Sequence, residues 1–239
     1  MTVRLDGIDL VIFDKDGTIL DFGRMWGGWA EGLAAALARE TGLDVKAPLF
    51  EMLGYDPVSR VVRPGGGLAA TPMARLRERT AEVLAAAGLS GAEAERSLGT
   101  VWHAPDPVEL AHPLADLHTL FAGLRASGRK VAIATTDDRR PTERTLAALG
   151  LTAAVDALVC ADDGVAVKPA PDMVARLSAK TGSTPDRTAV IGDSAADLRM
   201  ARAAGAALAI GVLSGVGDRA TLEPLADAVI DSVQDLRFD

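Results

Sequence analysis

The sequence predicts an α/β protein: a Rossmann-like core built on a parallel sheet, with an α-helical cap inserted after the first strand. Residues 10–13 are four apolar residues in a row, the pattern of a short buried strand. Residues 23–104 then follow helical spacing apart from one glycine-rich loop, so the first strand has no partner nearby. From about residue 113 onward, apolar strands alternate with helices, which is typical of βαβ units and of a parallel sheet that the first strand joins.

The inserted segment sets the expected domain boundaries. We expect the core to comprise residues 1–20 and 106–239, and the helical cap to comprise residues 21–105. Thr71 with Pro72 is typical of a helix start, and Ser90 with Glu93 of a capping box. The expected cap elements are helices over 25–41, 71–87 and 90–102, a short apolar stretch over 46–53, and a long non-helical stretch over 60–70.

The second half of the chain supplies the rest of the sheet. Pro105, Pro107 and Pro113 mark the return from the insertion. Glycines follow several of the helical segments, as helix ends require. The expected strands cover 130–135, 157–161, 188–192, 206–210 and 227–230, and the expected helices cover 114–127, 141–149, 171–181 and 195–204.

Composition narrows the range of partners. The formal net charge of -8 leaves no basic excess to neutralise a nucleic-acid backbone, so we expect no nucleic-acid partner. No apolar run is long enough to span a membrane, and the N-terminus lacks the pattern of a signal peptide, so a soluble cytoplasmic protein is expected. Cys160, the one cysteine, lies in an apolar run and is expected to be buried and inert.

Two carboxylates follow the first strand directly, in the run Asp14-Lys15-Asp16-Gly17-Thr18. A strand period of two would point Asp14 and Asp16 to the same side, and Gly17 permits a sharp turn. Adjacent carboxylates repel each other unless a cation or a proton offsets the charge. The pair therefore indicates phosphoryl transfer, with Asp14 as nucleophile, Asp16 as acid and base, and Mg²⁺ as the cation. The alternative is a plain turn, which Asp-Gly favours by itself.

Polar groups also stand at the ends of the later strands. Thr135 and Thr136 end one strand, Lys168 follows the next, and Asp193 follows another. Ligands bind beyond the carboxyl ends of parallel strands, so we expect these groups to lie together. Thr135 and Thr136 would bind phosphoryl oxygens, Lys168 would supply a catalytic positive charge, and Asp193 would bind Mg²⁺ with Asp14. Each has a plainer alternative when taken alone: a strand end, a solvated lysine and a helix cap.

These motifs resemble those of the haloacid dehalogenase-like (HAD-like) hydrolase superfamily. The insertion is similar to the helical cap of the subfamily that includes phosphoglycolate phosphatase and β-phosphoglucomutase. The resemblance implies that Asp14 forms an aspartyl-phosphate, that Asp16 is the general acid and base, and that the backbone carbonyl of Asp16 is a metal ligand. The matching motifs are the Asp14 run, Thr135, Lys168-Pro169, and Gly192-Asp193-Ser194 with Asp197.

The resemblance also narrows the reaction. Dehalogenases of this superfamily lack the second carboxylate, so Asp16 favours phosphate esters. The expected function is a Mg²⁺-dependent phosphatase for a small phosphorylated metabolite, active as a monomer or homodimer. The alternatives are a phosphomutase of the same superfamily and a non-catalytic phosphate-binding protein. Arg63, with Arg60 in the same cap stretch, is a candidate for binding the rest of the substrate, and the alternative is a solvated surface arginine.

Overall fold

The computed structural model describes residues 3–63, 66–71, 73–103, 106, 108 and 111–237. The chain divides into two compact units, one formed by Met1–Asp21 and Pro107–Asp239 and the other by Phe22–Asp106. The assignment of these units as catalytic core and cap stays a prediction. Three residues named in the sequence analysis lie outside the described ones, Pro72, Pro105 and Pro107, as do residues 64 and 65 of the expected non-helical stretch.

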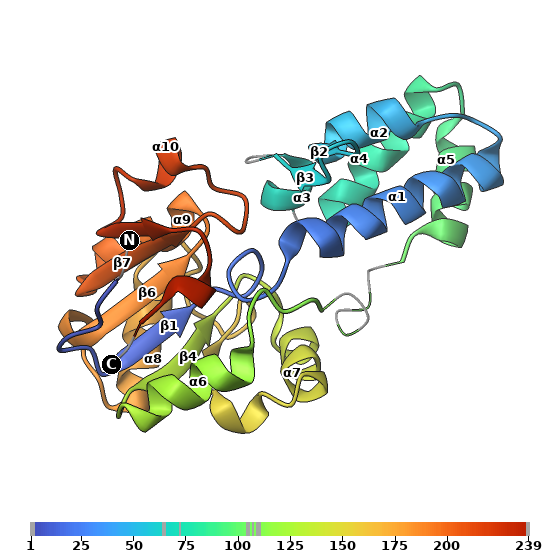
Figure 1. Ribbon diagram of the computed structural model, residues 1–239. Helices are drawn as coiled ribbons and strands as arrows, with labels where there is room; N and C mark the ends of the chain where they lie inside the picture. The colour runs from blue at the N-terminus through green and yellow to red at the C-terminus, as the bar shows by residue number, and fades with distance from the viewer. Residues whose placement is uncertain are drawn as a thin grey trace. The chain divides into compact units, whose positions relative to one another are not determined.

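The larger unit is built on a parallel sheet, in which the first strand lies between later ones (Figure 1). The strand order is β5-β4-β1-β6-β7-β8. Phe13 at the end of β1 pairs with Ile133 of β4 on one side and with Ile191 of β6 on the other. The predicted α/β fold is confirmed. The strands are β1 (Leu10–Phe13), β4 (Lys130–Ala134), β5 (Ala157–Val159), β6 (Thr188–Gly192), β7 (Leu208–Val212) and β8 (Ala228–Ile230).

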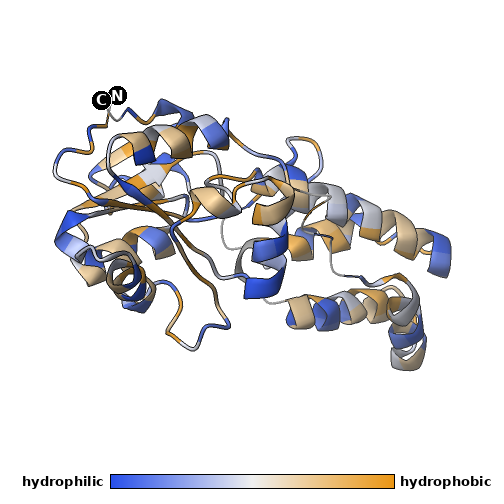
Figure 2. Cartoon of the chain, turned by 90° about the horizontal axis from the view of Figure 1, so that it is seen from below, coloured by the Kyte–Doolittle hydropathy of each residue, from blue (hydrophilic) through white to orange (hydrophobic). Residues whose placement is uncertain are grey.

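Helices cover both faces of this sheet, because alternate residues of each strand point to opposite sides. Val11 and Phe13 of β1 belong to the apolar cluster that includes α6 (Leu117–Ala126) and α7 (Arg139–Ala148). Leu10 and Ile12 belong to the opposite cluster, with α8 (Asp172–Thr181) and α9 (Ala195–Ala204). Figure 2 shows the hydrophobic residues along the strands. Shorter elements complete the unit: α10 (Arg219–Leu222) and the 3-10 turns Thr152–Ala154, Pro185–Arg187 and Val233–Asp235.

The predicted element bounds agree closely at β6 and α9 and shift elsewhere for local reasons. Helix α6 begins at Leu117 rather than at residue 114, because the Asp116 side chain caps it by accepting from the Thr119 N–H. Strand β7 begins at Leu208 rather than at residue 206, because the backbone N–H of Ala206 still bonds to the end of α9.

The smaller unit consists mainly of helices, and the short apolar stretch expected over residues 46–53 is one of them, α2. The expected capping box is confirmed: the Ser90 side chain accepts from the Glu93 N–H, and the Glu93 carboxylate accepts from the Ser90 N–H. The helices are α1 (Phe22–Thr41), α2 (Lys46–Leu53), α3 (Gly67–Ala70), α4 (Met73–Ala86) and α5 (Gly91–Val101).

The expectation of one non-helical stretch over residues 60–70 is wrong at its C-terminal end, where residues 67–70 are helical, while residues 61–62 are non-helical but form a strand. β3 (Val61–Val62) pairs antiparallel with β2 (Tyr55–Asp56), and α3 follows. Gly66 and Gly54 explain the compact path: a Cβ on Gly66 would lie 2.8 Å from the Gly54 Cα. A Cβ on Gly67 would lie 2.5 Å from the Met52 carbonyl oxygen. These glycines permit close backbone packing within this unit.

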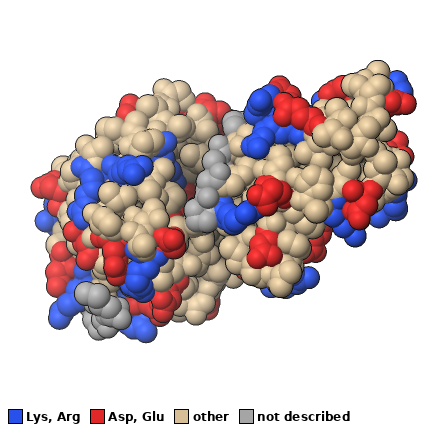
Figure 3. Space-filling model, turned by 90° about the horizontal axis from the view of Figure 1, so that it is seen from above, with Lys and Arg blue, Asp and Glu red and all other residues tan. Residues whose placement is uncertain are grey.

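The surface mixes both signs of charge. On the face shown in Figure 3, basic and acidic side chains are interspersed over the larger unit and over the smaller one. Across the part of the chain that the structure describes, the helices are too short or too polar to cross a membrane.

Candidate active site

Three neighbouring strands, β4, β1 and β6, end at the same edge of the sheet. Asp14 follows β1, and its N–H donates to the Ile191 carbonyl of β6 at 2.9 Å. Thr135 follows β4, and Asp193 follows β6. The chain runs from β1 outward to β4 and β5 on one side and to β6, β7 and β8 on the other. β1 is therefore the switch point of the sheet, where ligands of α/β enzymes bind.

Lys168 is held between two carboxylates at this edge. Its Nζ lies 2.5 Å from the Asp14 Oδ1 and 2.6 Å from the Asp197 Oδ1. The lysine side chain is only 5% exposed, which excludes the solvated alternative. Burial raises the pKa of the Asp14 carboxyl well above its ordinary value, and Lys168 opposes that shift. Burial alone would lower the pKa of Lys168, but Asp14 and Asp197 outweigh it, so the amine stays charged.

Asp193 is fixed by a loop that sequence reasoning missed, residues 213–217. Its Oδ2 accepts from the Val216 N–H at 2.7 Å, and its backbone carbonyl accepts from the Gly217 N–H at 2.9 Å. The Thr18 hydroxyl donates to its Oδ1 at 3.4 Å. The predicted sharp turn at Gly17 is present, with φ +84°, and a Cβ there would lie 2.5 Å from the Asp193 Oδ2. The two glycines after β7 were the available signal for this loop.

The segment after β6 also caps α9. Ser194 is the N-cap: its hydroxyl accepts from the Asp197 N–H at 3.3 Å, and its N–H donates to the Asp197 Oδ2 at 3.0 Å. The cap that the sequence suggested for Asp193-Ser194 therefore lies at Ser194 alone, which leaves the Asp193 side chain directed to the site. Asp197 both closes the capping box and pairs with Lys168.

The carboxylates of Asp14, Asp193 and Asp197 form a group that fits a divalent cation. One oxygen from each lies within 4.8 Å of the other two. Burial raises the pKa of Asp193 to about 6, and the nearby Asp197 carboxylate adds to the shift. Such repulsion is relieved by a hard cation that prefers oxygen, of which Mg²⁺ is an example. The predicted ligand set was Asp14, Asp193 and the backbone carbonyl of Asp16, so Asp197 is an addition from the structure.

The Asp16 carboxylate belongs to a second charged cluster. Lys15 Nζ lies 2.7 Å from the Asp16 Oδ2 and 2.9 Å from the Asp137 Oδ2. β1 ends at Phe13, so the strand period does not extend over Asp14 and Asp16, and each carboxylate contacts its own lysine. Burial raises the pKa of Asp16 to about 6, although Lys15 opposes it. Lys15 was not among the predicted site residues.

The remaining predicted residues have different surroundings. Thr135 is buried, and its Oγ1 accepts from the Asp137 N–H at 3.1 Å. Thr136, the next residue, is exposed. Arg63 lies in the smaller unit, half exposed, and its guanidinium pairs with the Glu51 carboxylate at 2.8 Å. Cys160 is free and buried as expected, and burial raises the pKa of its thiol to about 11.

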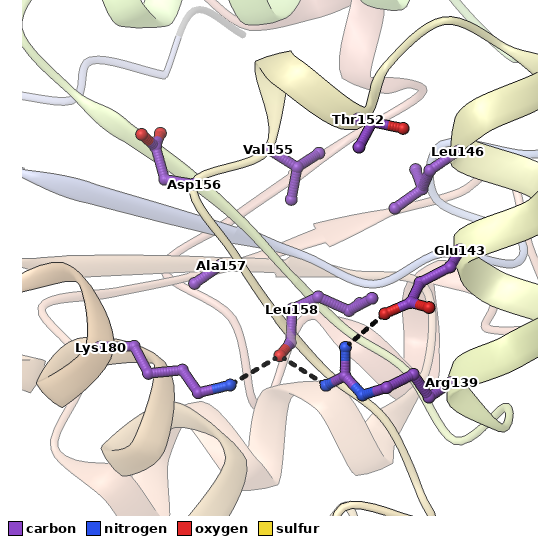
Figure 4. Close-up of a pocket in the computed structure, with 9 residues that line it drawn as sticks. All are labelled: Arg139, Glu143, Leu146, Thr152, Val155, Asp156, Ala157, Leu158 and Lys180. Atoms are coloured by element: carbon purple, nitrogen blue, oxygen red, sulfur yellow. Dashed lines mark hydrogen bonds and ion pairs between the residues drawn. The ribbon is translucent and has the colours of Figure 1, made fainter.

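A separate cavity of about 450 Å³ lies beside the edge strand β5 (Figure 4). Arg139 of α7 and Lys180 of α8 both point toward the Leu158 carbonyl, to which they donate at 3.1 and 3.4 Å. Cationic side chains so placed protect the backbone of an edge strand from pairing with another chain. The cavity lining includes none of the charged groups around Asp14 or Asp16.

The parallel sheet, with its carboxylates and a buried lysine at the switch point, defines the class: an α/β enzyme of Rossmann-like architecture. The model of the haloacid dehalogenase-like hydrolase family matches residues 8–205, so the chain belongs to that family. The predicted family and the prediction of a hydrolytic enzyme are confirmed.

Proteins that are similar to this chain in sequence or in structure agree with this assignment. A phosphoglycolate phosphatase from Rhodospirillum rubrum is 30% identical over 203 residues, covering 82% of this chain and 76% of that protein. Among solved structures, a predicted phosphoglycolate phosphatase from Haemophilus somnus has a TM-score of 0.63 at 17% identity, with 96% of each chain covered. A HAD phosphatase from Thermococcus onnurineus also has a TM-score of 0.63, at 20% identity, with 95% of each chain covered. At these identities the structures support the fold alone.

Proposed function

We propose that this chain is a Mg²⁺-dependent phosphatase that hydrolyses a small phosphorylated metabolite, of the phosphoglycolate or sugar phosphate type. The observation that carries the proposal is the buried lysine at the switch point, Lys168, whose Nζ lies 2.5 Å from the Asp14 carboxylate. A cation in that place can compensate the negative charge of both the nucleophile and the transferred phosphoryl group. The relative named phosphoglycolate phosphatase in Rhodospirillum rubrum supports the substrate class.

The proposed reaction has two steps, each with a role for Asp16. In the first, an Asp14 oxygen attacks phosphorus, the ester P–O bond breaks, and the leaving alkoxide takes a proton from Asp16. In the second, Asp16 takes a proton from water, the water oxygen attacks the phosphorus of the aspartyl-phosphate, and phosphate and the free Asp14 carboxylate are released. The first step needs Asp16 protonated, and burial, which raises the pKa of the carboxyl to about 6 against the effect of Lys15, makes protonation easier than for an ordinary carboxyl.

Other residues would compensate the charge of the phosphoryl group and position it. Lys168 would compensate the negative charge of the phosphoryl group, and the Thr135 hydroxyl, with Thr136 beside it, would bind phosphoryl oxygens. Asp14, Asp193 and the Asp16 backbone carbonyl would hold Mg²⁺, which when bound supplies further charge compensation at the phosphoryl oxygens. The expectation that the protein acts as a monomer or a homodimer stays a prediction.

The proposal is tested with a panel of phosphorylated metabolites and Mg²⁺, measuring free phosphate. Asp14→Asn should abolish turnover while the fold remains, since an amide is not a nucleophile. Asp9→Asn is the matched control, because Asp9 precedes the same strand at its opposite end and pairs with Arg187 on the surface. Persistent turnover in Asp14→Asn, with deamidation excluded by mass spectrometry, would contradict the assignment. Dependence on a bisphosphate activator with little phosphate release would favour the phosphomutase instead.

Arg63 stays a proposed contact for the rest of the substrate, and the same panel tests it. Its pairing with Glu51 and its half-exposed side chain favour the surface alternative. If Arg63 binds the substrate, Arg63→Ala should lower kcat/KM for the metabolite and spare p-nitrophenyl phosphate. Equal effects on both substrates would assign Arg63 to the solvated surface.

A further inference from the structure

Lys15 occupies an unusual position for a lysine. It is the middle residue between Asp14 and Asp16, and its side chain is only 2% exposed. Burying an ammonium group is costly unless hydrogen bonds and opposite charges compensate it. An apolar side chain would fill the same space without that cost. The buried ammonium therefore indicates a role for its charge, and the residues that it contacts indicate which role.

Both partners of Lys15 belong to the candidate site. Its Nζ contacts both oxygens of Asp16, at 2.8 and 2.7 Å, so the carboxylate is held from one side. It also contacts the Asp137 Oδ2 at 2.9 Å. A charge-assisted contact of the ammonium to both oxygens holds the carboxylate more firmly than a hydrogen bond to one oxygen would.

Asp137 connects this cluster to the loop after β4. Its N–H donates to the Thr135 Oγ1 at 3.1 Å, and its carbonyl accepts from the Ala161 N–H at 3.0 Å. The backbone of Asp137 is thus anchored while its carboxylate reaches Lys15. The ion pair ties the loop that carries Asp16 to the loop that carries Thr135, across the boundary between β1 and β4.

We propose that Lys15 and Asp137 are positioning residues, which hold the Asp16 carboxylate in the orientation that proton transfer to the leaving group requires and keep Thr135 in register with it. This inference rests on the proposed phosphatase function. Lys15 itself touches no reacting atom in this scheme. Its counterpart Lys168 acts on the phosphoryl charge, so the two lysines have separable effects.

The test compares two leaving groups in Lys15→Met and Asp137→Asn. Misplacing a catalytic group by about 1 Å costs about 100-fold, so Lys15→Met should lower kcat by about that factor for the best alkyl phosphate. The loss should be far smaller for p-nitrophenyl phosphate, whose leaving group needs little protonation, and KM should change little for either. Asp137→Asn, at a side chain that is 39% exposed, should give a weaker effect of the same kind. Lys130→Met is the control, because Lys130 is exposed and lies at the opposite end of β4.

A double variant decides whether the two residues act together. If Lys15 and Asp137 act together, the double variant Lys15→Met with Asp137→Asn should lower kcat by less than the product of the two single effects. Equal loss on both leaving groups in the folded variants, or no loss in either, would overturn the inference while the wild-type phosphatase activity stands. If Lys15→Met does not fold, the leaving-group dependence of Asp137→Asn decides alone. A wild-type protein that releases no phosphate from any substrate would overturn the inference and the proposed function together.

Discussion

Two buried lysines, Lys168 and Lys15, each lie between two carboxylates at the same edge of the sheet. Lys168 contacts Asp14 at 2.5 Å and Asp197 at 2.6 Å, and Lys15 contacts Asp16 at 2.7 Å and Asp137 at 2.9 Å. Their surroundings differ. Asp14 and Asp197 are 12% and 2% exposed, whereas Asp137 is 39% exposed. The first cluster is closed, and the second has one side open to solvent.

In the proposed mechanism, this difference suits the two ion-pair clusters to different steps. In the closed cluster, three carboxylates crowd one lysine, which leaves a negative excess that a divalent cation can compensate. In the open cluster the lysine contacts both oxygens of one carboxylate and is anchored by a second. We therefore expect the first cluster to bind charge and the second to orient a proton donor, and the following experiments separate these roles.

Apart from Asp14→Asn, which should abolish turnover, the largest effect is expected for Asp16→Asn, in the open cluster. Loss of a general acid and base should lower the rate on the order of 10²–10⁴-fold. The loss should be greater for an alkyl phosphate than for p-nitrophenyl phosphate, since the alkoxide needs the proton. Steady-state kinetics with both substrates provide the measurement. A uniform loss would mean that Asp16 acts on charge, as Lys168 does, and the distinction between the clusters would fail.

Lys168→Met, in the closed cluster, should lower the rate by on the order of 10²–10³, the cost of removing one group that stabilises transition-state charge. In contrast to Asp16→Asn, the loss should be similar for both leaving groups, because the charge on the phosphoryl group is common to them. The same kinetics test it, with Lys180→Met as the control, since Lys180 donates to the Leu158 carbonyl of the edge strand. A loss confined to the alkyl phosphate would contradict the proposed role.

The sequence was sufficient to predict that Lys168 lies close to Asp14, but not where the Lys15 side chain lies, for a physical reason. Strands β4, β1, β6 and β5, the strand that precedes Lys168, are apolar runs, so their ends could be located, and parallel strands place their ends at one edge. The contacts of Lys15 could not be predicted from residue spacing. Its amine turns back to Asp16 and reaches Asp137, which lies in the loop after a neighbouring strand. Long-range side-chain contacts of this kind depend on sheet order.

The smaller unit and the loop after β7 show the same limit. The three longer helices of the smaller unit, α1, α4 and α5, followed from caps and periodicity. Helix α3 and the hairpin of β2 and β3 did not, because elements of two to four residues have no measurable period. The Val216 N–H that fixes Asp193 comes from a backbone group, which no side-chain pattern reveals. Backbone donors of this kind become visible only in the folded structure.

Asp193→Asn tests the negative excess of the closed cluster. Loss of one carboxylate should weaken Mg²⁺ binding by at least about tenfold, because hard cations prefer charged oxygen ligands. Without Mg²⁺, the variant should be at least as stable as the wild type, since the raised pKa of Asp193 means that its charged form is disfavoured in the fold. Calorimetric Mg²⁺ titration and thermal unfolding provide the two measurements. An unchanged Mg²⁺ affinity would restrict Asp193 to a structural role.

The smallest effect is expected where an ion pair lies outside both clusters, at Asp163 and Arg139. The guanidinium of Arg139 lowers the pKa of Asp163 to about 2, against burial, which raises it. A carboxyl with a lowered pKa stabilises the fold above its ordinary value of 3.8 and loses that contribution as the pH falls through about 2. Because Arg139 is a third exposed, the expected contribution is discounted to about 1 kcal/mol.

Asp163→Asn should therefore lower the free energy of unfolding by about 1 kcal/mol at pH 7, with a fall in Tm of about 2–4 °C. The difference from the wild type should shrink steadily between pH 4 and pH 2, as the wild-type carboxylate takes up its proton. Urea unfolding at several pH values measures this, and kcat for both leaving groups should stay close to the wild-type value. If Asp163→Asn instead lowered kcat as Lys168→Met does, the closed cluster would extend along the loop from Asp163 to Lys168. The residues of the closed cluster that affect the rate would then include more than those that contact Asp14.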